Sequence, residues 1–293
     1  MQISLIYLSD LPQYKTEKLY ELWIPTEPGV PKTNREFTTY HGINLTDARE
    51  NTTTFDFETT GFKFLYRPSK FPVVEQDFQG SECPEPVEKY LQETVDIMKE
   101  LFDAEFVVCY DWRFRKNTGP QTYDIDITTP ERVIAKRPAR IVHTDESFKG
   151  GKITVERHLS EEELNKFREP GWRTKIVTCW RPTIAIVEDT PLALCDRRSV
   201  AIDEPVPCDK VLEDYVDESF YLKYNSAHKW YWLSRQTRDE IAVFVVWDSK
   251  KDEQYLVGPP HACFENPEAP SDAEKRVSIE ARFIVVHKDV EKR

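Results

Sequence analysis

Two stretches of the chain show the spacing of apolar residues that belongs to a helix. Over residues 84–102 the apolar positions recur every three or four residues, charged residues fall between them, and prolines stand at the start. This pattern predicts an amphipathic helix. A shorter helix is predicted over residues 161–169, because Ser160 and Glu163 have the spacing of a capping box and a Pro-Gly pair follows.

Most of the other apolar residues fall in short β-like segments separated by Asp, Asn, Pro and Ser. These segments are residues 3–8, 62–66, 105–113, 174–180, 183–187, 220–224, 229–233, 241–247, 255–257 and 277–287. Many short strands at roughly regular spacing are typical of a β-sandwich or barrel. We therefore expect a mainly β protein, a double-stranded β-helix (jelly-roll or cupin-type barrel) with flanking helices.

The chain has no stretch rich enough in Gly, Ser or Pro to serve as a linker, so residues 1–293 are expected to form a single domain. Residues 105–287 would form the β-barrel core, and residues 1–104 an N-terminal extension packed on it. The Thr- and Asn-rich stretch 38–60 is expected to be an excursion or a binding loop. Together with residues 199–218, it is expected to shape a substrate pocket.

Charge and composition exclude several classes of function. With 40 Lys and Arg against 52 Asp and Glu, the formal charge is −12, which disfavours binding to a nucleic-acid backbone. No apolar run approaches the roughly 18 residues that span a bilayer, so a membrane is not an expected partner either. The chain shows no targeting signal, and its six scattered cysteines form no C-x-x-C pair. Both features favour the cytoplasm and free thiols.

His143 and Asp145 form the most informative polar pair. They follow an apolar pair at residues 141–142, and residues i and i+2 of a strand point to the same face. Both could offer a ligand atom to one metal ion. A second, distant histidine would complete a set of two histidines and one carboxylate, which leaves three coordination positions open. Taken alone, the pattern more often marks a hydrogen-bonded His–Asp pair at a strand end.

The candidate for the distant histidine is His261, which lies at the end of a β-like segment. Its alternative role is that of a histidine capping a turn. His228 stands in a strongly aromatic segment and could line a pocket, although a packed histidine is the commoner case. The remaining histidines lie in polar or terminal contexts.

The last predicted strand alternates between an apolar face and a polar face. The polar face carries Arg276, Ser278, Glu280 and Arg282. Two arginines in a barrel strand need anionic partners, because an unpaired buried charge is costly. A bidentate arginine with a serine hydroxyl suits a carboxylate such as that of 2-oxoglutarate. We expect one arginine to bind a carboxylate and the other to be structural. Alternatively, Arg282 pairs with a core acid such as Glu240 or Asp196.

Trp180, Arg181 and Trp230 are candidates, with His228, for the wall of a substrate pocket. Trp180 and Arg181 could equally form a structural cation–π corner. The sequence contains no G-x-S-x-G, G-x-G-x-x-G or G-x-x-x-x-G-K-[ST] motif. Serine-hydrolase and nucleotide-fold chemistry therefore have no matching residues.

Taken together, these segments resemble a family of fungal hydroxylases and desaturases that includes the gibberellin desaturase and the aspergillic-acid-pathway hydroxylase. The bacterial proteins of cephamycin methoxylation are similar. The matching segments are residues 142–145, 179–182, 191–200, 228–231, 239–240, 247–249, 260–264 and 276–282. They cover about half of the chain, and the first 130 residues match only loosely.

The resemblance implies a non-heme oxygenase of secondary metabolism that uses Fe(II) and O2, usually with 2-oxoglutarate, on a small-molecule substrate. It implies His143, Asp145 and His261 as the iron ligands. Arg276 with Ser278, or Arg282, would hold a carboxylate of 2-oxoglutarate. Two alternatives stay open: an iron oxidase that needs no 2-oxoglutarate, and a β-barrel that binds ligands without catalysis.

Overall fold

The computed structural model describes residues 1–50, 54–78, 83–119, 136–251 and 256–289. Its α-helices are α1 (Glu85–Phe102), α2 (Phe148–His158) and α3 (Glu161–Phe167). Its strands are β1 (Gln2–Leu8), β2 (Leu19–Leu22), β3 (Phe37–Asp47), β4 (Phe62–Tyr66), β5 (Ala104–Lys116), β6 (His143–Thr144), β7 (Trp172–Pro182), β8 (Leu192–Cys195), β9 (Pro205–Val211), β10 (Val216–Leu222), β11 (Trp230–Trp232), β12 (Glu240–Asp248), β13 (His261–Cys263) and β14 (Val277–Lys288).

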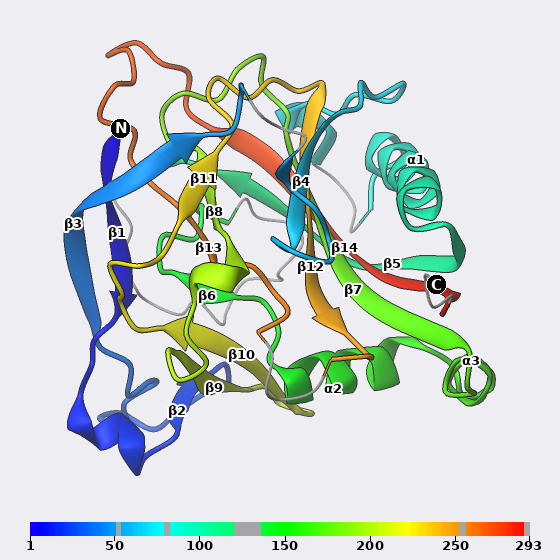
Figure 1. Cartoon of the computed structure of the whole chain (residues 1–293), viewed down its shortest axis with the longest axis horizontal. Coiled ribbons are helices and arrows are strands. Elements are labelled where there is room, and N and C mark those ends of the chain that lie inside the picture. The colour runs from blue at the N-terminus through cyan, green and yellow to red at the C-terminus, as the bar shows by residue number, and fades with distance from the viewer. Residues whose placement is uncertain (51–53, 79–82, 120–135, 252–255, 290–293) are drawn as a thin grey trace.

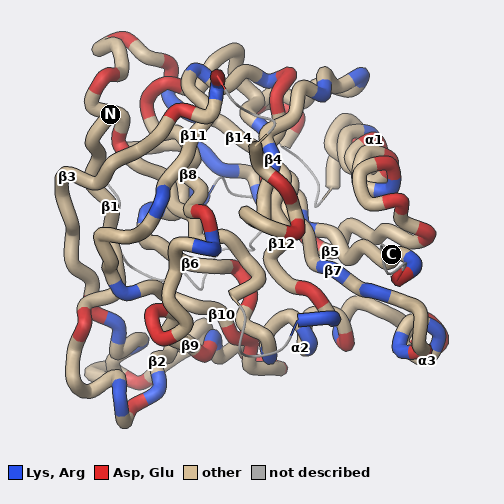
Figure 2. The backbone as a smooth tube through the Cα atoms, in the orientation of Figure 1, with Lys and Arg blue, Asp and Glu red and all other residues tan. Residues whose placement is uncertain are grey.

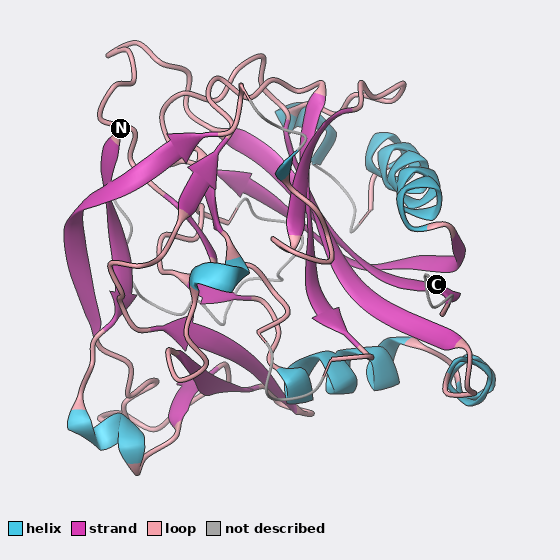
Figure 3. Ribbon diagram, viewed as in Figure 1, coloured by secondary structure: helices cyan, strands magenta, loops and turns pink. Residues whose placement is uncertain are grey.

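The strands form two curled sheets, with α1, α2 and α3 at the side and lower edge of the molecule in the view of Figures 1 and 3. The nine-stranded sheet has the order β1-β3-β11-β8-β13-β6-β10-β9-β2, and the five-stranded sheet has the order β4-β12-β7-β14-β5. Except for the hairpin β9–β10, neighbouring strands come from distant parts of the chain, so both sheets depend on long connections. This mainly β architecture confirms the predicted fold class.

Both predicted helices form where their local signals place them. Helix α1 follows Pro84, buries Val87, Tyr90 and Met98, and ends at Asp103, which adopts a left-handed conformation. Helix α3 begins with the predicted capping box, in which Ser160 accepts the backbone N–H of Glu163 and Glu163 accepts that of Ser160. Local pattern is sufficient here because each helix carries its own boundaries.

The prediction of an excursion or loop over residues 38–60 is wrong for the first half of that stretch. Most of β3 lies in it, paired with β1 on one side and β11 on the other. The small polar residues of β3 stand on its exposed positions, which explains why the segment lacks a strong apolar signal. Strands β1, β2 and β3 all belong to the nine-stranded sheet, and β4 belongs to the other.

Three further expectations need correction. Residues 183–187 are not a strand, because β7 ends at Pro182 and only Ile186 makes an isolated bridge. The strand expected at 255–257 begins at a residue outside the described part of the chain, and residues 256–257 are not in a strand. Residues 199–218 are not only a loop, because they contain β9 and the start of β10.

Helix α2, which the sequence pattern does not predict, packs against β10 and β12.

Strand β14 lies inside the five-stranded sheet, between β7 and β5, and nearly all of it is buried. Its apolar residues Ile279, Ala281 and Phe283 join the main hydrophobic core. Its polar residues point to the opposite face, where they must find partners inside the protein. This strand therefore brings charged side chains into the interior of the barrel.

Among the described residues, no helix is both long and apolar enough to cross a membrane. Acidic and basic residues are interspersed over both sheets and the helices (Figure 2). Four cysteines are buried free thiols: Cys179, Cys195, Cys208 and Cys263.

Candidate metal centre

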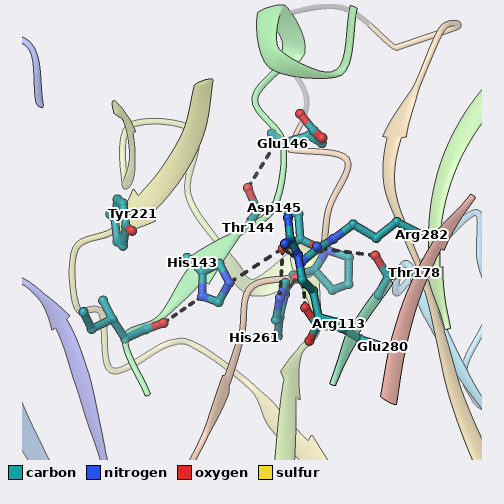
Figure 4. A network of polar contacts seen from close by, with 12 residues as sticks. Arg113, His143, Thr144, Asp145, Glu146, Thr178, Tyr221, His261, Glu280 and Arg282 are labelled. Atoms are coloured by element: carbon teal, nitrogen blue, oxygen red, sulfur yellow. Dashed lines mark hydrogen bonds and ion pairs between the residues drawn. The ribbon is translucent and has the colours of Figure 1, made fainter. Parts of the chain in front are cut away.

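His143 and His261 are direct partners in the antiparallel pair β6–β13. Their ring centroids lie 4.3 Å apart. Asp145 follows β6, and its Oδ1 lies 3.7 Å from Nε2 of each histidine. One ligand atom from each of the three residues lies within 4.8 Å of the others, as Figure 4 shows around Asp145. The structure therefore gathers the three sequence-predicted metal ligands at one point.

Backbone carbonyl groups orient both imidazole rings. Nδ1 of His143 lies 2.8 Å from the carbonyl oxygen of Ile141, and Nδ1 of His261 lies 3.1 Å from that of Pro259. A carbonyl oxygen only accepts hydrogen bonds, so Nδ1 carries the proton in both rings. Nε2 of each ring is thus left to face Asp145, where its lone pair could bind a metal ion. This is the arrangement that fixes metal-ligating histidines in their binding orientation.

The protonation states suit cation binding. Burial and the neighbouring His261 lower the pKa of His143 to about 3, so its ring is neutral. Burial alone would raise the pKa of Asp145, but Arg282 and the two histidines hold it well below its usual range. Thr178 also donates a hydrogen bond to Asp145 Oδ2 at 3.2 Å. Two imidazoles and one carboxylate match the facial set of non-heme Fe(II) sites.

Arg282 is held by acidic residues, although not by those considered from the sequence. Its guanidinium bonds Asp111 at 2.7 Å, Glu280 at 2.8 Å and Asp145 at 3.4 Å. The alternative pairing with Glu240 or Asp196 is wrong, because those residues contact Arg49 and Arg198 respectively. The guanidinium of Arg282 is therefore paired with acidic residues of the protein, and it helps to fix the position of the Asp145 carboxylate.

Arg276 has a different environment. It is buried, donates to the carbonyl oxygen of Thr190 at 2.9 Å and to Ser278 Oγ at 3.1 Å, and stacks 4.8 Å from the ring centre of Trp180. Within the described part of the chain, no carboxylate lies within 4.0 Å of its guanidinium. Burial lowers its pKa. The charge of Arg276 is thus available to an anion that the described residues do not supply.

A cavity lies between Arg276 and the three candidate ligands. It is lined by Arg115, Ala139, His143, Asp145, Thr178, Trp180, Leu192, Phe244, His261, Ala262, Cys263, Arg276, Glu280 and Arg282. Trp180 Nε1 is buried without a hydrogen-bond partner in the described residues. The cavity therefore contains a cation that has no carboxylate partner among the described residues, which suits an anionic ligand.

Of the four residues predicted for the substrate pocket, only Trp180 lines this cavity. Arg181 points to the other face of β7, where it donates to Tyr90 Oη and to the carbonyl oxygen of Arg238. The side chains of His228 and Trp230 both bond the hydroxyl of Tyr7 in a separate core cluster. His228 also bonds Glu204 at 2.8 Å. The aromatic character of residues 228–232 reflects core packing.

Sequence reasoning missed the part of the site that β5 contributes. Arg115 forms a bidentate pair with Glu280, at 2.7 and 2.8 Å, and Asp111 holds Arg282. Asp111, Arg113 and Arg115 alternate with aromatic residues. That period of two, beside the same period in β14, is the signal that could have identified a charged interior face.

Comparison with known proteins agrees with the geometry. The chain is 29% identical, over 92% of its length and 91% of the relative's, to the Fe(II)/2-oxoglutarate-dependent dioxygenase nvfI of Aspergillus novofumigatus. It is 25% identical to the hydroxylase/desaturase efuI of Hormonema carpetanum, over 85% of each chain. The solved structure of the iron and alpha-ketoglutarate-dependent endoperoxidase NvfI superposes with a TM-score of 0.81 at 25% identity, covering 98% of both chains.

The resemblance to fungal hydroxylases and desaturases is thus confirmed, and it extends over most of the first 130 residues, where the sequence motifs match only loosely. A family model matches residues 5–286. The chain belongs to the family described as the oxidoreductase/YMDC permease-like domain.

Proposed function

We propose that this chain is an Fe(II)- and 2-oxoglutarate-dependent oxygenase that hydroxylates, desaturates or oxidatively cyclises a small-molecule secondary metabolite. The observation that carries the proposal is the convergence of two histidine Nε2 atoms and one carboxylate at the wall of a cavity. The names of the similar fungal enzymes support it.

In this proposal His143, Asp145 and His261 hold the iron. Iron with 2-oxoglutarate and O2 supplies an oxidant able to remove hydrogen from an unactivated C–H bond. The protein contributes the fixed orientation of its ligands. The backbone carbonyls orient the two rings, and Arg282 with Thr178 fixes the carboxylate.

Arg276 and Ser278 are proposed to bind the carboxylate of 2-oxoglutarate that is remote from the metal. The support is the contrast between two arginine side chains: the guanidinium of Arg282 has three acidic partners, whereas that of Arg276 has none among the described residues. Trp180 and Phe244 cover the cavity with apolar surface. Exclusion of water strengthens the charge interaction with the ligand.

The whole chain is proposed to act as one oxygenase domain, since strands from both its first hundred residues and its last hundred share each sheet. Its free cysteines accord with a reducing compartment, and we propose that the enzyme works in the cytoplasm.

The proposal is tested by anaerobic titration of the apoprotein with Fe(II) and then with 2-oxoglutarate, while the weak visible charge-transfer band of the chelated cosubstrate is followed. One iron per chain and the band are expected. Both should be lost in His261→Ala and kept in His41→Ala, a control histidine that bonds Ser4 at the surface. Iron binding without a band would favour an oxidase that needs no 2-oxoglutarate. Absence of iron binding would overturn the metal centre.

A further inference from the structure

The guanidinium of Arg197 donates hydrogen bonds to four backbone carbonyl groups. It begins the short 3-10 turn Arg197–Ser199, two residues after β8 ends. Its Nε donates to the carbonyl oxygen of Thr59 at 2.9 Å and its Nη1 to that of Val257 at 2.6 Å. Its Nη2 donates to the carbonyl oxygens of Glu58 at 2.6 Å and Phe57 at 3.3 Å. No carboxylate in the described residues lies within 4.0 Å of this guanidinium.

These bonds join three segments that are remote in sequence. Residues 57–59 belong to the connection between β3 and β4, and Val257 belongs to the connection between β12 and β13. A planar guanidinium presents five N–H donors in a fixed fork, so it can hold several carbonyl groups in one geometry. Arg197 therefore crosslinks the two connections through their main chains.

One of the carbonyl groups that Arg197 binds, that of Val257, is close in sequence to the candidate metal ligand His261. Val257 lies four residues before His261, and the carbonyl of Pro259 between them accepts the Nδ1–H of His261. The carbonyl of Pro260 in turn accepts the backbone N–H of Cys195 at 2.8 Å. Cys195 and Arg197 thus hold the segment at Pro260 and Val257, on either side of the carbonyl that orients the ring.

Close packing also restricts the position of residues 258 and 259. A side chain added at Gly258 would meet the carbonyl oxygen of Val246 at 3.1 Å and Thr144 at 3.4 Å. The ring of Pro259 lies against Gly61, where an added Cβ would be 3.2 Å from Pro259 Cδ and 3.4 Å from Arg197 Cδ. Gly61 has a positive φ and closes the turn that Arg197 binds. The segment therefore has little room to shift unless Arg197 releases it.

The sequence explains why a side chain is needed for this task. Pro259 and Pro260 have no N–H, so this segment can donate no ladder hydrogen bond at these positions. The corresponding carbonyl before His143 is held differently: Ile141 bridges Ile6 of β1, and the N–H of Val142 donates to the carbonyl oxygen of Ile6 at 2.8 Å. Main-chain pairing thus supports His143, whereas an arginine supports His261.

We propose that Arg197 is a positioning residue for the metal centre, which fixes residues 257–260 so that His261 presents Nε2 to the ion. The inference rests on the proposed metal centre. It assigns to Arg197 a role that is separate from cosubstrate binding, because Arg197 does not line the cavity that holds Arg276.

The test uses Co(II), whose visible spectrum reports coordination number and geometry, and compares wild type with Arg197→Met. Arg198→Met is the matched control, since Arg198 is the adjacent arginine, is exposed, and bonds only Asp196 in the described residues. We expect Arg197→Met to weaken Co(II) binding about 10–100-fold and to change its spectrum, as loss of an outer partner of a metal ligand does. Arg198→Met should match wild type in both.

A folded Arg197→Met variant with unchanged Co(II) affinity and spectrum would overturn the inference. If the methionine variant does not fold, Arg197→Lys replaces it, because lysine keeps the charge but cannot span four carbonyls. An intermediate affinity with a shifted spectrum supports the role, and wild-type behaviour contradicts it. Failure of the wild type itself to bind Co(II) would instead refute the metal centre.

Discussion

His143 and His261 face each other across a single pair of short strands, and each ring is tied to the carbonyl oxygen two residues before it. The two residues are thus equivalent in geometry although 118 positions (261 − 143) separate them. Each presents one nitrogen at 3.7 Å from the same oxygen of Asp145. The three residues form one candidate metal site, so we expect the loss of either histidine to disable the whole site.

His143→Ala and His261→Ala should each weaken Fe(II) or Co(II) binding at least about 100-fold, and the double variant should bind little more weakly than either single one. Removal of one ligand destroys the site, and groups that act together give non-additive losses. Metal affinity measured by competition with a chelator checks this. Losses that add fully in the double variant would show that the two rings bind separate ions.

Arg276→Gln should weaken 2-oxoglutarate binding about 10–100-fold while leaving Fe(II) binding unchanged, because charge-assisted hydrogen bonds to a carboxylate are lost. Arg282→Gln should instead lower the free energy of unfolding by about 3–5 kcal/mol, because three carboxylates that are at most 13% exposed lose their common partner. Titration of the charge-transfer band and urea unfolding separate the two effects. The reverse assignment would be shown if Arg282→Gln alone lost cosubstrate binding.

Glu280→Gln should destabilise the apoprotein by about 3–5 kcal/mol near neutral pH. Burial alone would raise the pKa of Glu280, but Arg115 and Arg282 lower it to about 2 from its ordinary 4.5. Folding therefore favours the ionised form. The stabilisation is present in full above pH about 4.5 and is lost as the pH falls towards 2.

The difference in urea midpoint between wild type and Glu280→Gln should accordingly shrink as the pH is lowered through this window. Glu85→Gln serves as the control, because Glu85 pairs with Lys89 on the exposed face of α1 and should leave the midpoint unchanged. A difference that stays constant down to acid pH would mean that Glu280 is not held ionised by the arginines.

Gly151→Ala should lower the free energy of unfolding by about 1–3 kcal/mol, although alanine favours a helix over glycine. An added Cβ would lie 2.1 Å from the ring of Trp247, whose Nε1 donates to the carbonyl oxygen of Phe148. Thermal unfolding with Lys152→Ala in the same helix as control checks this. A stabilised Gly151→Ala variant would show that α2 can move away from β12.

The same contact explains why α2 could not be predicted from the sequence. Gly150 and Gly151 weaken the helical signal, yet they are required because the helix approaches β10 and β12 closely. By contrast, α1 and β14 could be predicted, since each has a long, regular pattern of apolar residues. Short strands such as β6 and β13 exist only through their pairing partners, which no local pattern specifies.

The residues of the candidate site likewise include some that the sequence could predict and some that it could not. His143 and Asp145 could be found from their spacing of two residues, and Arg276 and Arg282 from the polar face of one strand. The distinction between the two arginines, however, depends on Asp111 of a different strand. His228 and Trp230 looked like pocket residues because aromatic side chains serve cores and pockets equally well, and only the fold separates these uses.

Strand β14 is the last strand among the described residues, yet it is an inner strand of its sheet, between β7 and β5. During synthesis, β5 and β7 therefore emerge long before the strand that must separate them. Until β14 is made, β5 and β7 each lack a pairing partner along one edge. The cavity cannot close before then. Non-local strand pairing of this kind makes folding slow and leaves edges exposed to aggregation. Truncation of the C-terminus, even far from His143, should yield an insoluble protein.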